Sequence, residues 1–201
     1  MSLHTQDALT RYDFAVIAGW ITPGERVLDL GCGDGSLLRS LRDHKKVLGY
    51  GVEIDPDNVT ACIKNGINVI QSDLERGLAG FEDRFFDHVV MSLSLQTVRH
   101  TEGLLAEMLR VGREAVVTFP NFGHRSHRDA IAQGRMPVSE TLPYQWYDSP
   151  NVRFFTIADF EALCAARQIV VREGRFFDDA QPVTENPNLN AELAIYRLGR
   201  A

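Results

Sequence analysis

The sequence predicts an α/β fold with a doubly wound, mostly parallel sheet of seven strands. Two observations carry this prediction. Short apolar runs that suit buried strands alternate along the chain with segments of helical periodicity. One run, at residues 27–30, breaks into glycine at positions 31, 33 and 35, and a helical pattern follows from Ser36. This strand, turn and helix is the unit at which open α/β sheets bind their ligands.

Apolar patterning and local signals predict the other elements. Thr156 and Asp159 form a capping box, which predicts a helix that runs to about Arg167. Residues 101–111 are predicted as an amphipathic helix. Residues 5–20 are predicted as a lead-in helix, with Leu9, Tyr12, Val16 and Trp20 near one face. The predicted strands span residues 27–30, 48–55, 69–74, 85–93, 115–119, 169–171 and 193–196.

Residues 120–151 are the irregular part of the chain. The chain has 201 residues and 44% hydrophobic content, so residues 1–201 are expected to form a single domain. The segment 120–151 is expected to be an insertion within that domain. It contains prolines at 137, 143 and 150, which resist continuous helix. It also carries Tyr144, Trp146 and Tyr147, which need burial or a partner. Two accounts stay open: a loop packed on the sheet edge, and a lid or partner-binding surface.

Charge and length limit the classes of partner. The net charge is −6, so a general electrostatic footprint for nucleic acid is missing and no nucleic-acid partner is expected. A local basic patch, which is also typical of a solvated helix face, is formed by His124, Arg125, His127 and Arg128. No run approaches the roughly 18 apolar residues of a membrane span, and a signal peptide pattern is missing. We therefore expect a cytoplasmic protein without a membrane partner.

The three cysteines predict neither a disulfide framework nor a metal site. Cys32, Cys62 and Cys164 form no C-x-x-C pair and no cluster with histidine. Cys32 lies inside the glycine turn. We expect it to be a small residue packed under the loop and not a nucleophile.

The glycine turn reads Asp29-Leu-Gly-Cys-Gly-Asp-Gly35. A dinucleotide fold is the nearest alternative, but its G-x-G-x-x-G fingerprint needs glycine where this chain has Ser36. Asp29 and Asp34 would also repel a diphosphate at this helix N-terminus, whereas a cationic ligand would gain from them. S-adenosylmethionine, which carries a sulfonium and an amino group, fits this requirement.

The D-x-G-x-G-x-G turn resembles motif I of class I S-adenosylmethionine-dependent methyltransferases. In that Rossmann-like fold the last strand is antiparallel. The resemblance implies that Glu53 accepts both ribose hydroxyls, that Ile54 covers the adenine, and that Asp73, at the end of the third strand, accepts the adenine amine. The expected cofactor is S-adenosylmethionine or S-adenosylhomocysteine. The full predicted binding set is Asp29, Gly31, Cys32, Gly33, Gly35, Glu53, Ile54, Asp73, Leu74 and Ser92.

The sequence identifies no catalytic residue. Methyl transfer is mainly a positioning problem, and a general base is needed only when the acceptor must lose a proton. His100, His124 and Tyr147 are bases by type only. Asn121 follows the fifth strand, whereas the Asn-Pro-Pro-Tyr motif of amine-methylating enzymes follows the fourth.

From about residue 23 to residue 173 the chain resembles the MetW family of methionine biosynthesis proteins. The most specific stretches are Thr118-Phe-Pro-Asn-Phe-Gly-His124 and Leu142-Pro-Tyr-Gln-Trp-Tyr-Asp-Ser-Pro-Asn151. The resemblance implies a role beside homoserine O-acyltransferase, as an accessory or regulatory subunit that binds S-adenosylmethionine. The alternative is an S-adenosylmethionine-dependent methyltransferase that acts on an unknown small molecule.

Overall fold

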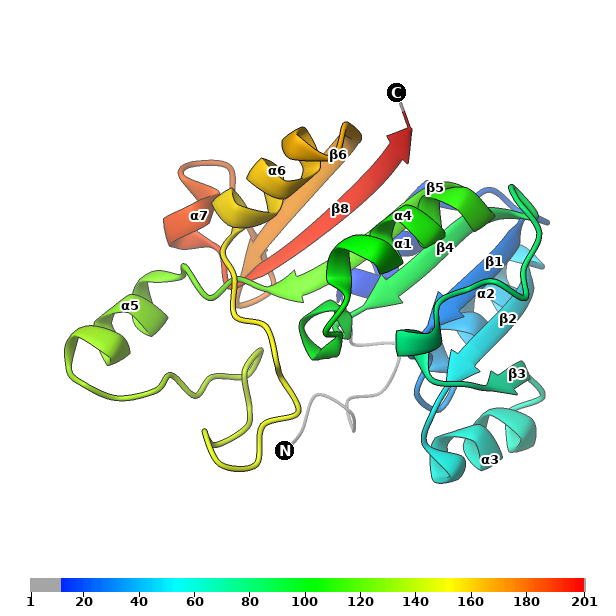
Figure 1. Cartoon of the computed structure of the whole chain (residues 1–201), viewed down its shortest axis with the longest axis horizontal. Coiled ribbons are helices and arrows are strands. Elements are labelled where there is room, and N and C mark those ends of the chain that lie inside the picture. Colours follow the sequence, from blue (N-terminus) through cyan, green and yellow to red (C-terminus); the bar gives the residue numbers. More distant parts are fainter. Residues whose placement is uncertain (1–11, 201) are drawn as a thin grey trace.

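The computed structural model describes residues 12–200, which form an eight-stranded sheet with helices on both faces (Figure 1). The strand order is β3-β2-β1-β4-β5-β8-β6-β7. The strands are β1 (Arg26–Leu30), β2 (Leu48–Glu53), β3 (Asn68–Gln71), β4 (Phe86–Ser92), β5 (Gly112–Pro120), β6 (Ile169–Asp178), β7 (Gln181–Pro182) and β8 (Leu193–Arg200). The helices are α1 (Tyr12–Trp20), α2 (Ser36–Lys45), α3 (Pro56–Lys64), α4 (Thr101–Val111), α5 (Arg125–Ala132), α6 (Ile157–Ala166) and α7 (Pro187–Asn190), with 3-10 turns η2 (Leu74–Arg76) and η3 (Leu95–Thr97).

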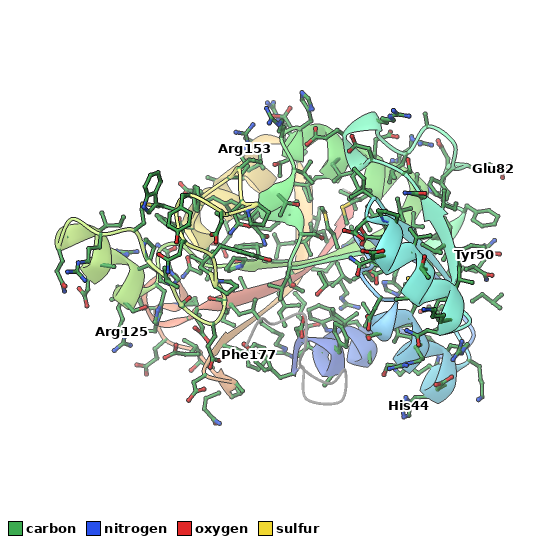
Figure 2. All side chains as sticks on the ribbon, turned by 90° about the horizontal axis from the view of Figure 1, so that it is seen from below. His44, Tyr50, Glu82, Arg125, Arg153 and Phe177 are labelled. Carbon is green, nitrogen blue, oxygen red and sulfur yellow. The ribbon has the colours of Figure 1, made fainter. Side chains whose placement is uncertain are left out.

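Two helical layers cover the sheet. Helices α1, α2 and α3 pack on one face, in a core cluster that includes Val27 of β1 and Val90 of β4. Helices α4 and α6 pack on the other face, where Leu28 and Val89 join the second cluster. Neighbouring residues of a strand point to opposite faces, so both positions are buried and the central strands read as continuous apolar runs. Figure 2 shows the layers edge-on, with His44 of α2 on one side and Arg153 on the other.

The carboxyl ends of β1, β2 and β4 meet at one edge of the sheet. Strand β1 pairs in parallel with β2 on one side and with β4 on the other. The chain thus winds outward from β1 to β3 and then crosses back to β4 and β5. This reversal is the switch point at which doubly wound sheets open a crevice for a ligand. The glycine turn after β1 lies there.

The C-terminal strands are antiparallel. Strand β8 inserts between β5 and β6 and runs antiparallel to both, which confirms the expectation for the last strand. Seven strands were predicted and residues 12–200 form eight, because the two-residue β7 pairs with the end of β6. Strands β6 and β8 also extend well beyond the short apolar runs that predicted them. Their backbone pairing continues through polar residues such as Arg175, which the apolar pattern did not mark.

Several local predictions change. The part of the lead-in helix at 5–11 lies outside the described residues. In α1 the buried side chains are Asp13, Phe14 and Ile17, whereas Tyr12, Val16 and Trp20 of the predicted face are only half-buried. The insertion after β5 contains α5, which agrees with the helix-face account of the basic patch. Figure 1 shows that this segment projects from the carboxyl end of β5, away from the sheet. No helix among residues 12–200 is long and apolar enough to cross a membrane.

Candidate functional site

The glycine turn is held by backbone bonds to the neighbouring strand. The N–H groups of Gly31 and Cys32 both donate to the Val52 carbonyl, at 2.8 and 3.1 Å. Gly31, Gly33 and Gly35 all have positive φ, as the turn required. A Cβ at Gly35 would lie 3.0 Å from Ile67, but a Cβ at Gly33 would meet nothing within 4 Å. Gly33 therefore borders open space at the edge of the sheet.

Glu53 joins this turn to the end of β2. Its buried carboxylate accepts the Gly33 N–H through Oε2 at 2.8 Å. Oε1 accepts the N–H groups of Ile54 and Asp55 at 2.8 and 3.0 Å. The carboxylate thus bridges the two loops that follow β1 and β2. The sequence indicated that Glu53 stands at a strand end, but not that it bonds to Gly33.

Two cysteines pack beneath the turn. Cys32 and Cys62 are buried with free thiols, and their Sγ atoms lie 3.7 Å apart. Cys62 also donates to the Gly33 carbonyl at 3.1 Å. Burial is the main cause that raises the pKa of both thiols, and Asp29 adds to it at Cys32. Both groups stay protonated near neutral pH, which agrees with the prediction that Cys32 packs and is not a nucleophile.

The other predicted site residues occupy different positions around the same edge. Asp29 is buried near the end of β1, and Ile54 is 58% exposed at the end of β2. Strand β3 ends at Gln71, so Asp73 does not terminate it as predicted. Asp73 instead begins the turn η2, where it accepts the Glu75 N–H at 2.9 Å. Leu74 is half-buried and packs against the core.

Ser92 ends β4 beside helix α1. Its hydroxyl donates to Asp13 Oδ2 at 3.0 Å, and Asp13 is buried. This contact ties α1 to the carboxyl end of β4, close to the switch point. Sequence reasoning missed Asp13 because only apolar residues of the lead-in helix were assigned to its inner face. The available signal was the position of Asp13, an acidic residue among apolar residues in a helix that packs on a sheet.

The chain after β5 is organised by Asn121, whose side chain is fully buried. Its Nδ2 donates to carbonyls of the α7 region, at 2.7 Å for Ala191 and 3.2 Å for Asn188. Its Oδ1 accepts the N–H groups of Gly123 and Ile157 at 3.0 and 3.3 Å. With its amide occupied on both sides, Asn121 fixes the start of the insertion to α6 and α7. Its position after β5 therefore has a structural purpose.

The histidines of the predicted basic patch face inward. His127 Nδ1 lies 3.0 Å from the Asn121 carbonyl, which can only accept, so Nδ1 carries the proton. Nε2 then accepts from the Ser139 hydroxyl at 3.0 Å. Burial lowers the pKa of both His127 and His124, so both are neutral near pH 7. Only Arg125 and Arg128 of the patch are exposed and charged.

The aromatics of the insertion differ in burial. Trp146 and Tyr147 are 75% and 70% exposed and pack edge to face on one another, with ring centroids 5.7 Å apart. Tyr144 is half-buried. The account in which this loop covers its own aromatics is therefore wrong for Trp146 and Tyr147. Within residues 12–200 no group of three or more histidine, cysteine, aspartate or glutamate side chains is arranged to hold a metal.

Structural comparison assigns the fold. A methyltransferase from Mesorhizobium loti, described as S-adenosylmethionine dependent, superposes with a TM-score of 0.72 at 18% identity, over 96% of this chain and all of that one. The magnesium protoporphyrin IX methyltransferase of Synechocystis, solved with bound S-adenosylhomocysteine, gives a TM-score of 0.65 at 18% identity, over 94% and 83% of the two chains. The chain therefore has the class I methyltransferase fold.

Sequence comparison assigns the family. A bifunctional methionine biosynthesis protein MetXA/MetW from Rhodopirellula baltica is 40% identical over 194 residues, which cover 90% of this chain. This chain spans only 31% of that longer protein. A family model for the methionine biosynthesis protein MetW matches residues 11–198. The chain belongs to the MetW family of methionine biosynthesis proteins.

Proposed function

We propose that this protein binds S-adenosylmethionine and acts as an accessory or regulatory subunit of homoserine O-acyltransferase. One observation carries the proposal: a relative that is 40% identical over nearly the whole chain is a single bifunctional protein, MetXA/MetW. Two activities fused in one polypeptide operate at high effective concentration, which is useful when the two parts work together. Where the two proteins are separate chains, we infer that they reach the same high effective concentration by forming a complex.

The cofactor part of the proposal rests on the glycine turn and Glu53. The turn leaves open space at Gly33, and the Glu53 carboxylate beside it can accept further hydrogen bonds from hydroxyl donors. The buried Asp29 adds negative charge that suits a sulfonium. A neighbour of the same fold binds S-adenosylhomocysteine. We infer that the ligand lies across the carboxyl ends of β1 and β2.

Four polar side chains near the insertion argue against methylation of an acceptor that must lose a proton. Asn121 and His127 are committed to holding the chain together. His100 is exposed and pairs with Glu75 at 2.6 Å. Tyr147 packs on Trp146 at the surface. These contacts give none of the four the free, directed geometry that an acceptor-activating base needs.

The partner surface is the exposed aromatic pair. Trp and Tyr are enriched where interfaces gain most of their binding energy. Trp146 and Tyr147 present both rings to solvent on a segment that projects from the sheet (Figure 1). We infer that this pair contacts the acyltransferase.

The test combines co-purification with activity. Expressed with its homoserine O-acyltransferase, the protein should form a stable complex and raise or permit acylation, and a titration of S-adenosylmethionine should change the rate. Such regulation requires the ligand to bind the active and inactive arrangements with different affinity. If no complex forms and the acylation rate is unchanged, the accessory role is overturned. Robust transfer of a labelled methyl group to cell metabolites would then favour the methyltransferase alternative.

Variants separate the two halves of the proposal. Replacing Trp146 and Tyr147 together with alanine should weaken the complex and leave S-adenosylmethionine affinity intact. The matched control is Ile63→Ala, an exposed apolar side chain on α3 that lies outside the insertion. If Ile63→Ala weakens the complex as much as the double variant, the aromatic pair is not the contact surface.

A further inference from the structure

A second cleft opens between helices α4 and α6, on the face of the sheet opposite α2. Its volume is about 610 Å³, within the usual range for sites that hold small molecules. The first turn of α4, one side of α6 and residues 153–155 line it. None of its lining residues belongs to the glycine turn or to the set predicted to bind the cofactor. The cleft is therefore a separate feature of the protein.

The floor of the cleft is apolar. Phe155 and Phe160 both pack on Phe119 of the core, with ring centroids 4.7 and 4.8 Å away, so this part of the floor is rigid. Leu163 continues the floor along α6. Phe154, at the end of the cleft, is 48% exposed. A ligand with an apolar body would cover these side chains, and removing this apolar surface from water would favour binding.

The two acidic residues that line the cleft, Glu102 and Asp159, are both held by hydrogen bonds. Glu102 forms a two-pronged ion pair with Arg167, with N–O distances of 2.8 Å. Asp159 accepts from the backbone and hydroxyl of Thr156 in the capping box of α6. Of the two, only Glu102 is paired with a cation within residues 12–200. The rim also carries two cationic side chains, Arg99 and Arg153.

Two arginines of the rim have no carboxylate partner among residues 12–200. Arg153 donates one Nη2 bond to the Arg99 carbonyl at 2.6 Å, which brings the two residues together. His100 leaves the N-terminus of α4 without a side-chain cap, so the positive end of that helix also faces the cleft. Two unpaired guanidinium groups beside an uncapped helix start attract an anionic group.

We propose that this cleft binds an amphiphilic anion. A carboxylate, phosphate or sulfonate head lies between Arg99 and Arg153, and an aliphatic or aromatic body lies on Phe154, Phe155 and Leu163. The charged end and the apolar floor together define the ligand class. The proposal is independent of the role with the acyltransferase, because it concerns other residues and a different ligand.

The test uses 1-anilinonaphthalene-8-sulfonate, a fluorescent amphiphilic anion, with the whole protein. It should bind with enhanced fluorescence, and octanoate should displace it at about tenfold lower concentration than octanamide, which has the same apolar body without the charge. The double variant Arg99→Gln/Arg153→Gln should abolish this preference. The double variant Arg84→Gln/Arg135→Gln removes two exposed charges elsewhere and should retain it.

Three results would overturn the proposal: no binding of the probe, equal displacement by octanoate and octanamide, or an unchanged preference in Arg99→Gln/Arg153→Gln. Trp146→Ala guards against probe bound to the exposed aromatic pair, and it should leave the displacement unchanged. Loss of the octanoate effect in Trp146→Ala would assign the probe to that surface instead. Thermal unfolding of each variant shows that the fold is intact, because all four arginines are exposed and their replacement should move Tm little.

Discussion

The glycine turn and the insertion after β5 lie at the same edge of the sheet but are built in different ways. The turn has three glycines at positive φ, and the end of the neighbouring strand holds it through two bonds to Val52 and one to Glu53. The insertion is fixed from a distance, because Asn121 ties it to residues nearly seventy positions later in the chain. The backbone shape of the first region therefore follows from its own glycines, whereas the shape of the second depends on long-range packing. The predictions below test that difference.

The largest effect is expected at Gly33. Gly33→Val should abolish detectable binding of S-adenosylmethionine by calorimetry, because the side chain would fill the open space beside Glu53 and strain a residue whose φ is +56°. The control is Gly24→Val, which has a φ of +84° and equally open surroundings, but lies before β1. Both variants should lose similar stability. Equal loss of binding in the two would mean that strain, and not occupied space, is the cause.

Asn121→Ala should give the largest loss of stability. It leaves buried donors and acceptors from several segments without partners, which should lower the free energy of unfolding by about 2–4 kcal/mol in a denaturant titration. Cofactor affinity of the folded protein should stay unchanged. Asn68→Ala, at an exposed position of β3, is the matched control. A concurrent loss of cofactor affinity would mean that the two regions are not independent.

Glu53→Ala should weaken S-adenosylmethionine binding by roughly 1–3 kcal/mol, because charge-assisted bonds are lost. Asp57→Ala, which removes an exposed carboxylate from the first turn of α3, should have little effect. If calorimetry shows unchanged affinity in Glu53→Ala, Glu53 does not bind the ribose hydroxyls of the cofactor.

The smallest effect is the pH dependence of the insertion. Burial lowers the pKa of His127 below its ordinary value of 6.5 in the folded protein, so the unfolded chain takes up a proton more readily. Its contribution to stability is complete above pH 6.5 and is lost as the pH falls below it. His127→Gln should be less stable at pH 8 and should show a shallower fall in Tm between pH 7 and 5. If the plots of Tm against pH are parallel for the two proteins, His127 is not held neutral in the folded protein.

The same division explains what the sequence could and could not predict. The turn at 29–35, the helix at 101–111 and the capping box of Thr156 follow from local patterns, and the structure confirms them. The contact between Cys32 and Cys62, thirty positions apart, depends on how α3 packs beneath the turn and has no local signature. The basic patch was compatible with a helix face, and α5 is that helix, but the burial of His124 and His127 had no local signal. The burial of Asp13 depends likewise on a partner, Ser92, at the far end of another strand.

Glu53 spans two loops with one side chain. One oxygen reaches Gly33 while the other reaches the N–H groups at the start of the next turn. An aspartate at this position carries the same charge but is one methylene shorter, and it would have to release one loop in order to hold the other. The length of the side chain is therefore specified as strictly as its charge. A redesign of this site must therefore keep a side chain of glutamate length at position 53, so that it still reaches both loops.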